Sequence, residues 1–485
     1  MTGTSSSRRR DQVALAVIAL GAFLLRVFPF FGPDGAWGYR VDYDEGVYFS
    51  AAAVLFEGAL PYRDYVFVHP PGQLLFLALT SAWTHSFVGV DGAFALSRWI
   101  AALLGTINVL LVAKLVWRWP KGALFAAAFY ATYPELVQVE RGPFLEPLLN
   151  LVCLSLAIAV VNAETSARRL RWVYFAGALA GLAVSIKLWA VLWALGALWA
   201  LTSFATRREL LVFIGAALLA CGLIVLPFAL QAPSSFVTEV GLFHLWRPPD
   251  GFTDRLSRFG QIVALRHLLS PLLAASMVVL LISRRANWTV TTRVVVTAWV
   301  LTLAAFFAPG SYWSQYNAHL IASEAVLAGA LLGWGLPQLQ ARFRALASAV
   351  VLAGLGVSVF QCVVRARGDQ QHLLLARSPL KSSPDCVFTF EPSWSLAAGR
   401  LPPRTFVDNY AHQLLGAVSG GTRFASSDAA FGSMSAPLEV IDQCRSVILG
   451  DRGRRQLSPE LLTRLRATHA PVDVGGLEVW EKSLP

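Results

Sequence analysis

Apolar runs of about 20 residues recur along the first 364 residues, and short basic clusters separate many of them. A run of this length crosses the roughly 30 Å hydrocarbon core of a bilayer as one α-helix. Only 14% of the residues are charged and 56% are hydrophobic, whereas soluble domains carry about 25% charged residues. The sequence therefore predicts an all-α polytopic membrane protein and argues against a soluble multidomain protein.

The positive charge is distributed as in membrane proteins rather than as in nucleic-acid-binding proteins. Lys and Arg exceed Asp and Glu by 40 to 29, but from Arg365 onward the chain has 14 basic and 12 acidic residues. Most of the excess lies in clusters between apolar runs, which is typical of loops retained in the cytoplasm. Because Arg8, Arg9 and Arg10 precede the first run, we expect a cytoplasmic N-terminus and no nucleic-acid partner.

The expected crossings number about eleven and leave the end of the chain outside the cytoplasm. The first, at residues 13–31, is expected to be an uncleaved anchor, since no small-residue cleavage site directly follows it. Residues 71–88 are expected to lie along the outer surface or to dip in without crossing. The other crossings are expected at residues 94–117, 122–139, 143–161, 172–204 (two helices), 210–230, 268–282, 294–308, 318–336 and 345–364.

Residues 172–204 are apolar except for Lys187, and as one helix they would extend about 50 Å. That length exceeds the membrane core, and basic clusters flank both ends of the segment. We therefore expect a hairpin of two short helices with Lys187 near its outer tip. An unpaired lysine at a helix centre costs roughly 2.5–3.5 kcal/mol on insertion scales. Lys187 is therefore either functional or a side chain that reaches the interface.

Residues 365–485 differ in composition from residues 1–364 and are expected to form a separate extracytoplasmic domain. Strand-like runs occur at residues 386–390, 405–407, 446–449 and 477–480, with a helix-like run at 459–467. This pattern predicts a small α/β domain. Cys386 and Cys444 both lie in it and could pair in an oxidising compartment, while no zinc-binding spacing is present.

The first outer loop, residues 42–72, concentrates acidic residues beside the membrane in the sequence DYDEGVYFSAAAVLFEGALPYRDYVFVHPPG. Acidic side chains are costly there unless they are solvated, paired or used in function. After Glu45 the apolar positions recur at helical spacing, which predicts a short interfacial helix. Asp44 and Glu45 would lie at its N-terminal end, where the helix dipole favours negative charge. One interpretation is that they only cap this helix.

The same loop resembles that of the polytopic GT-C glycosyltransferases, specifically the bacterial relatives of dolichyl-phosphate-mannose protein mannosyltransferases and of lipid A aminoarabinose transferase. The shared features are an acidic pair after the first span, a run of spaced residues and a proline turn: Asp44-Glu45, then Tyr48, Gly58 and Pro61, then Pro70-Pro71. The organisation of roughly residues 12–364 also fits a GT-C-like transmembrane domain. The resemblance does not extend to the tail.

The resemblance implies transfer of a sugar, mannose or a related hexose by analogy, from a polyprenyl-phosphate carrier. The acceptor would be a glycan, lipid or protein on the extracytoplasmic face of the plasma membrane. Asp44 is implied as the general base that removes the acceptor proton, in a single inverting displacement. Asp42 is the second choice for the base, and Glu45 would orient the acceptor or a neighbouring basic group. General-base assistance contributes on the order of 10²–10⁴-fold.

A lipid phosphate at the outer surface requires positive charge, and the resemblance favours Lys187 for that role. His69 is expected either to bind phosphate or to cap a turn. Arg247 suits bidentate phosphate binding but lies beside a tryptophan, as interfacial anchors do. Tyr316 and His319 belong to an aromatic segment that is either a belt at the interface or the lining of a donor cavity.

No cofactor is expected, because the proposed chemistry can proceed with cationic side chains. A divalent metal bound by Asp44, Glu45, Asp64 and His69 stays open, although the spacing is unspecific. Two other functions also stay open. A transporter or flippase of lipid-linked sugars would place ionisable groups along a path through the membrane, and a structural scaffold of the cell envelope would depend on the tail.

Overall fold

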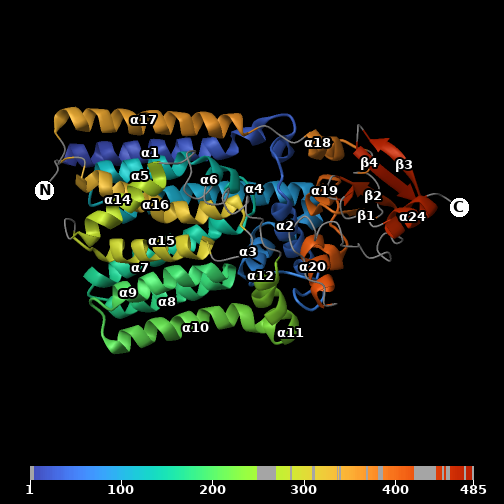
Figure 1. The fold of residues 1–485 in the computed structure, drawn as a ribbon, viewed down its shortest axis with the longest axis horizontal. Helices are drawn as coiled ribbons and strands as arrows, with labels where there is room; N and C mark the ends of the chain where they lie inside the picture. Colours follow the sequence, from blue (N-terminus) through green and yellow to red (C-terminus); the bar gives the residue numbers. More distant parts are fainter. Residues whose placement is uncertain are drawn as a thin grey trace.

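The computed structural model describes residues 5–247, 269–283, 287–307, 312–335, 337, 340–366, 370–378, 380, 386–419, 444–450, 453–454, 459–474 and 477–482. Long helices lie side by side in a bundle, and the tail, with a small sheet and short helices, lies beyond one end of it (Figure 1). The N-terminus is at the far end of the bundle, and the C-terminus is beside the sheet of the tail.

The bundle helices are α1 (Ser5–Val27), α4 (His85–Leu115), α5 (Pro120–Thr132), α7 (Leu145–Thr165), α8 (Arg169–Ile186), α9 (Val191–Leu201), α10 (Arg207–Ala229), α14 (Leu269–Ile282), α15 (Val290–Phe307), α16 (Asn317–Gly335) and α17 (Ala341–Val364). Within the described ranges, 6 helical segments are long and apolar enough to cross a membrane. The predicted polytopic helical class with a small C-terminal sheet is confirmed. The predicted number of about eleven crossings is higher than 6 and stays a prediction.

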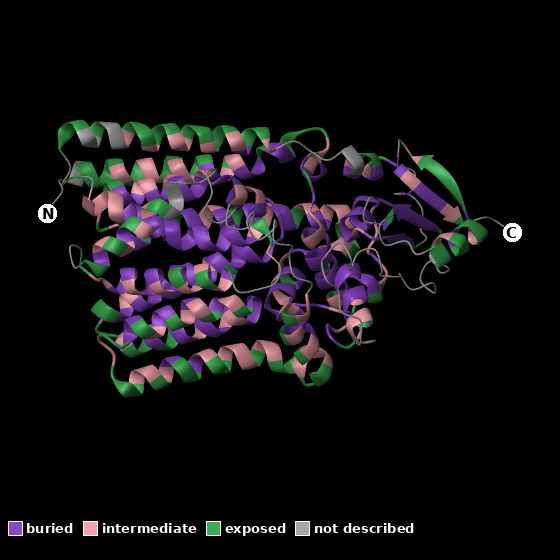
Figure 2. Cartoon of the chain, in the orientation of Figure 1, coloured by how far each residue is buried: buried purple, intermediate pink, exposed green. Residues whose placement is uncertain are grey.

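Burial separates the centre of the bundle from its flanks (Figure 2). Buried residues concentrate in α7 and α16, whereas α10 keeps large apolar side chains exposed, among them Leu218 and Leu223 at 70% each. Soluble monomers rarely expose a contiguous apolar surface of this kind. The flank of α10 is thus suited to lipid contact.

The predicted hairpin at residues 172–204 is confirmed as two helices with a break at Lys187. Helix α8 ends at Ile186, and Lys187 adopts an extended conformation (φ −152°, ψ 131°). A short 3₁₀ helix, η4 (Leu188–Ala190), then leads into α9. Lys187 therefore lies at the turn of the hairpin and not inside a helix.

Residues 122–139 form two helices and not the single one expected. Helix α5 ends at Thr132, Tyr133 is extended (φ −70°, ψ 118°), and α6 (Pro134–Val139) follows. Proline disfavours a helical conformation in the residue before it and lacks the N–H that would continue the helix. Pro134 therefore accounts for the break.

A layer of short helices lies between the bundle and the tail (Figure 1). It contains α2 (Tyr43–Phe56), α3 (Gly72–Thr80), α11 (Pro233–Phe236) and α12 (Phe243–Trp246). The short helices next to these elements in the chain are η1 (Phe28–Phe31), η2 (Gly35–Gly38), η3 (Ala82–Thr84), the π-helix η5 (Val237–Leu242) and η6 (Ser314–Tyr316). The predicted helix after Glu45 is α2, and most of it is buried because α3 and the tail pack against it.

The tail contains a four-stranded sheet of β1 (Val387–Thr389), β2 (Ser446–Leu449), β3 (His469–Val474) and β4 (Leu477–Lys482), in the order β1-β2-β4-β3. Strands β1 and β2 are parallel, and the other two pairings are antiparallel. The tail helices are α18 (Gln370–Ala376), α19 (Pro392–Ala397), η9 (Arg404–Phe406), α20 (Asn409–Ser419) and α24 (Pro459–Thr468). Cys386 and Cys444 form a disulfide.

The predicted strand at residues 405–407 is wrong, because η9 occupies this position. A short apolar run does not distinguish a strand from a buried helical turn. Phe406 is 4% exposed and packs edge-on against Phe388, with ring centroids 6.2 Å apart. Its apolar character thus reflects core packing and not a strand.

Candidate active site

The N-terminus of α2 is fixed by a capping box between Asp42 and Glu45. Asp42 Oδ1 accepts a hydrogen bond from the Asp44 backbone N–H at 3.2 Å, and Glu45 Oε1 accepts one from the Asp42 N–H at 3.1 Å. These bonds satisfy N–H groups that lack a partner within the helix. The side chain of Asp42 therefore serves as the helix cap.

Glu45 is 1% exposed and forms a buried ion pair with Arg98 of α4. Arg98 Nη2 and Nε lie 2.9 Å and 3.1 Å from Glu45 Oε2. The carboxylate also packs against Gly142, where a Cβ atom would lie 2.1 Å from Oε2. The contact of Glu45 with a neighbouring basic group thus connects α2 to the bundle.

Asp44 lies on the same turn of α2 but contacts different groups. Its Oδ2 accepts a hydrogen bond from Gln315 of η6. Burial, and then the charges of Asp42 and Asp408, raise the pKa of Asp44 to about 7, against the opposing effects of Gln315 and Arg247. A carboxyl group with a pKa near the working pH suits general-base catalysis.

Lys187 is paired, so the assumption that it is an unpaired lysine is wrong. Its Nζ lies 2.7 Å from Oε1 of Glu146, in the first turn of α7, and both residues are buried. The Nζ atom also lies 4.6 Å from the ring centroid of Tyr316 and 5.0 Å from that of Trp189. Pairing and cation–π contact offset part of the cost of burying the ammonium group.

Helix η6 connects the surroundings of Asp44 with those of Lys187. Gln315 donates to Asp44, and the ring of the next residue, Tyr316, contacts the ammonium of Lys187. Arg247 Nη1 donates to the Tyr316 hydroxyl at 3.4 Å. Asp44, Lys187, Tyr316 and Arg247 therefore meet. Helix α2, which contains Asp44, and α12, which precedes Arg247, lie at the end of the bundle that faces the tail (Figure 1).

Two histidines complete this group. Nε2 of His69 is 3.2 Å from the Tyr48 hydroxyl, and the His69 ring centroid is 5.7 Å from that of His244. Burial, and then His244, Lys187 and Arg247, hold the pKa of His69 well below its usual value. Burial is also the main cause that lowers the pKa of His244 to about 4. Both imidazoles are therefore neutral at pH 7. The single N–H of His244 is on Nε2 and donates to the Val68 carbonyl at 3.0 Å, whereas His69 can donate to an anion from Nδ1 when its Nε2 accepts from Tyr48.

His319 is in the first turn of α16, three residues after Tyr316 of η6, and is buried inside the bundle. Its Nδ1 is 2.8 Å from Oδ1 of Asn150, and its ring is 6.0 Å from that of Trp193. Asn150 continues this polar chain to the Tyr130 hydroxyl at 3.2 Å. His319 is therefore near the candidate site but belongs to a buried hydrogen-bonded chain of the bundle.

Four residues of the site were not expected from the sequence: Glu146, His244, Gln315 and Asp408. Glu146 offered a signal, because it is an acidic residue at the start of an apolar run. Gln315 lies beside the predicted Tyr316, and His244 lies near the predicted Arg247. Asp408 offered none, since its proximity to Asp44 depends on how the tail folds.

The possible metal site is not assembled in the described residues. Asp64 pairs instead with Arg63, with Nη2 and Oδ2 2.7 Å apart, and accepts a hydrogen bond from the Leu60 N–H at 2.8 Å. Across the described ranges, no group of three or more His, Cys, Asp and Glu side chains is arranged to hold a metal ion.

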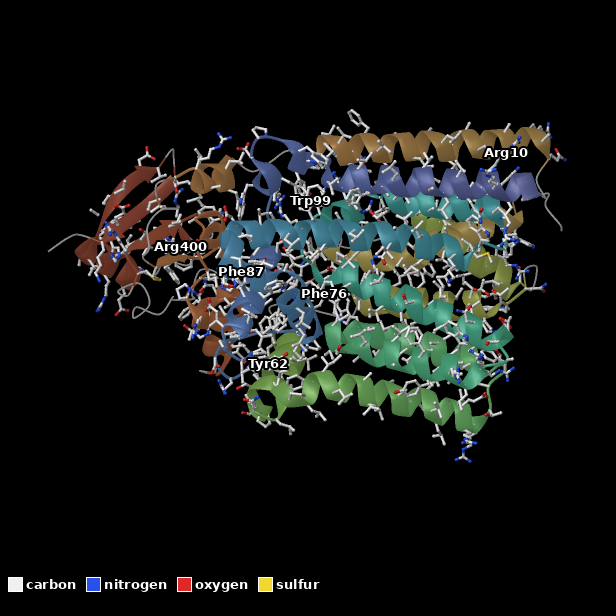
Figure 3. The ribbon with its side chains drawn as sticks, turned by 180° about the vertical axis from the view of Figure 1, so that it is seen from behind. Arg10, Tyr62, Phe76, Phe87, Trp99 and Arg400 are labelled. Atoms are coloured by element: carbon white, nitrogen blue, oxygen red, sulfur yellow. A yellow bond between two sulfur atoms is a disulfide. The ribbon has the colours of Figure 1, made fainter. Side chains whose placement is uncertain are left out.

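Figure 3 labels residues at both ends of the molecule and between them. Arg10 lies at the end of the bundle remote from the tail, and Arg400 lies in the tail. Tyr62 and Phe76, from the first outer loop and α3, lie between the tail and the bundle helices. The candidate site is therefore remote from the basic N-terminal cluster.

No family model matches the chain, and no curated protein matches it in sequence. Solved structures of other proteins are similar in fold. ArnT from Cupriavidus metallidurans in the apo state is 14% identical, with a TM-score of 0.64 over 98% of each chain. The same protein bound to undecaprenyl phosphate gives a TM-score of 0.60 at 14% identity, over 96% of this chain and 97% of that one.

The archaeal oligosaccharyltransferase AglB from Archaeoglobus fulgidus, in complex with an inhibitory peptide and a dolichol-phosphate, is also similar. It is 12% identical, with a TM-score of 0.60 over 99% of this chain and 75% of that one. These neighbours are glycosyltransferases of the GT-C fold. The predicted GT-C fold of the chain is therefore confirmed.

Proposed function

We propose that this protein is a membrane glycosyltransferase that moves a sugar from a polyprenyl-phosphate carrier to an acceptor hydroxyl on the extracytoplasmic face. The observation that carries the proposal is the position of Asp44 and Lys187 on either side of η6, at one end of the bundle. A carboxylate with a pKa of about 7 and a buried ammonium group supply a base and a phosphate-binding charge at the same place.

In the proposed reaction the acceptor oxygen attacks the anomeric carbon of the donor sugar. A new carbon–oxygen bond forms, and the bond between that carbon and the phosphate oxygen breaks with inversion. The acceptor proton passes to the carboxylate of Asp44, and the lipid phosphate leaves with the bonding electrons. Asp42 and Glu45 fix the first turn of α2 and so orient Asp44.

The leaving phosphate gains negative charge as the bond breaks, so cationic groups stabilise the transition state. Lys187 and Arg247 supply fixed positive charge, and Tyr316 connects them through its ring and hydroxyl. His69 supplies a neutral N–H donor, and its pKa would rise beside a phosphate. His244 instead donates its N–H to the Val68 carbonyl and so holds the first outer loop beside α12. His319 is bound to Asn150 within the bundle and is not expected to contact the phosphate.

The fold similarity supports the class of donor. ArnT has been solved with undecaprenyl phosphate bound, and AglB with dolichol-phosphate and an inhibitory peptide. We propose that this chain also takes a polyprenyl-phosphate sugar, with mannose or a related hexose as the first donor to test. The acceptor is proposed to be a glycan, a lipid or a protein of the cell envelope.

We also propose that the candidate site and the tail face the extracytoplasmic side of the plasma membrane. The basic cluster that contains Arg10 lies at the opposite end of the molecule, as the tendency of basic loops to stay in the cytoplasm requires (Figure 3). The disulfide between Cys386 and Cys444 is of the kind that forms in oxidising compartments. The tail, residues 365–485, then forms a separate domain over the site.

The test is a transfer assay with purified protein in lipid nanodiscs, a panel of radiolabelled polyprenyl-phosphate sugars and cell-envelope material. We expect label from one donor to move onto the acceptor and Asp44→Asn to abolish that transfer while donor binding remains. Glu460→Gln, which neutralises an exposed carboxylate of the tail, is the control and should be active. Wild-type turnover by Asp44→Asn would refute the role of Asp44 as the general base. In a parallel assay with the protein in sealed lipid vesicles, movement of intact donor across the membrane without transfer would indicate a transporter.

A further inference from the structure

The tail contacts α2 at the residue that precedes Asp44. The hydroxyl of Tyr43 donates a hydrogen bond to Asp408 Oδ1 and accepts one from the Tyr410 N–H, each at 3.0 Å. Asp408 Oδ1 also accepts a hydrogen bond from the Ala411 N–H at 3.0 Å, which caps the start of α20. One hydroxyl group thus joins the first turn of α2 to the first turn of α20.

An apolar contact supports this hydrogen-bonded connection. Tyr410, Ala411 and Leu414 of α20 pack with Val68 of the first outer loop and Phe243 of α12. Figure 1 shows α20 beside α2, on the side of the tail that faces the bundle. Asp408 is only 8% exposed. Its carboxylate is therefore enclosed between the tail and the site.

Asp408 adds negative charge beside Asp44. Among the residues that the structure describes, the other polar and charged groups that act on Asp44 are Asp42 and Tyr48 of α2, Gln315 of η6 and Arg247 after α12. The charges of Asp42 and Asp408 favour the protonated form of Asp44, whereas Gln315 and Arg247 favour the ionised form. The pKa of Asp44 therefore depends both on groups outside the tail and on Asp408, which the tail supplies.

We propose that Asp408 is a positioning residue of the active site, through which the seated tail prepares Asp44 to accept a proton. This inference rests on the proposed role of Asp44 as the base. Asp408 acts in two ways: its hydrogen bond with Tyr43 holds α20 against α2, and its charge makes Asp44 more basic. A tail that leaves α2 removes that charge, so Asp44 becomes a weaker base.

The test is a pH titration of Asp44 in the full-length protein. Difference infrared spectroscopy monitors the band of its protonated carboxyl group at each pH. Subtracting the spectrum of the matching variant that also carries Asp44→Asn isolates the signal of Asp44. Asp408→Asn removes the charge, but its amide oxygen can still cap α20 and accept from Tyr43. We expect the midpoint for Asp44 to fall by on the order of one pH unit.

Asp408→Ser, a second neutral helix cap, should lower the midpoint in the same direction, and Glu460→Gln should leave it unchanged. The acid side of the pH–rate profile should move with the titration. An unchanged midpoint in folded Asp408→Asn overturns the role of Asp408, even where transfer is observed. Because the titration requires no donor or acceptor, a shifted midpoint without transfer would contradict the proposed function instead.

Discussion

The ammonium nitrogen of Lys187 lies 2.7 Å from Oε1 of Glu146, and both side chains are buried where the α8–α9 hairpin meets the start of α7. The pair explains how a lysine is tolerated here without an anion from outside. It also means that part of the positive charge of Lys187 is already neutralised. An incoming phosphate would therefore share the ammonium group with Glu146.

Replacing one partner of this pair should destabilise the protein, and replacing both should not restore transfer. Lys187→Met leaves the Glu146 carboxylate buried without its cation, which costs about 3–5 kcal/mol in comparable pairs. Adding Glu146→Gln removes that charge, so much of the stability should return. Transfer should stay low in both variants, because the phosphate lacks the ammonium group.

The stability is measured by unfolding the purified protein in detergent, with circular dichroism as the signal. The radiolabel assay measures the transfer. Lys187→Arg serves as the comparison, since it keeps the charge but changes the geometry. Full transfer by the double variant would show that Lys187 only neutralises Glu146. The proposed phosphate site would then lose its main residue.

The rate of transfer should rise with pH through about 7, because the proposed base must be ionised and the pKa of Asp44 is about 7. Below that value, kcat/KM should fall about tenfold per pH unit. His244 has a pKa of about 4 and that of His69 is also lowered, so neither histidine should produce this limb. Initial rates from pH 5 to 9 at fixed ionic strength check the prediction.

Glu239 is the necessary control for that profile. Burial raises its pKa to about 7 as well, and its Oε2 accepts a hydrogen bond from the Phe67 N–H at 2.8 Å. Glu239→Gln should keep the acid limb, because this residue does not act as the base. Loss of the limb in Glu239→Gln would reassign the titration from Asp44 to Glu239.

The parts of the fold that depend on chain length and charge were predictable from the sequence. Residues 172–204 were too long for one span, and the hairpin with Lys187 at its turn follows from that excess. The helix at Asp44 followed from local spacing and capping chemistry. The break before Pro134 could also have been predicted from local chemistry, but the continuous apolar run favoured a single helix.

The contacts between distant residues were not predictable from one sequence. Arg98 pairs with Glu45 across 53 positions, and Asp408 lies beside Asp44 only because α20 folds onto α2. Periodicity predicts which face of a helix is buried, but it does not identify the partner. The cost of an unpaired charge indicates that a partner exists, which is why Lys187 was identified and Glu146 was not.

The ion pair between Arg98 and Glu45 should contribute more to stability than to chemistry. Arg98→Met leaves Glu45 with a buried charge and should destabilise the protein by about 3–5 kcal/mol. Glu45→Gln should cost less, because glutamine still completes the capping box. Arg98 also keeps its hydrogen bonds to the carbonyls of Ala36 and Arg40.

Thermal unfolding of both variants, together with kcat measured on the folded fraction, separates the two roles. We expect folded Glu45→Gln to retain most of the wild-type kcat. A loss as large as that of Asp44→Asn, in protein of normal stability, would give Glu45 a direct part in the reaction.

The tail should be stabilised by its disulfide and should be accessible only from outside the cell. The bond joins the starts of β1 and β2 and closes a loop between residues 58 positions apart. Replacing Cys386 and Cys444 by serine should destabilise the tail by about 2–4 kcal/mol.

Cys386 has an exposed side chain, so it should react with a membrane-impermeant maleimide after reduction of intact cells and not before. The variant in which both tail cysteines are replaced gives the background of the remaining free cysteines, which are Cys153, Cys221 and Cys362. Labelling that requires permeable cells would place the tail in the cytoplasm and contradict the proposed orientation of the site.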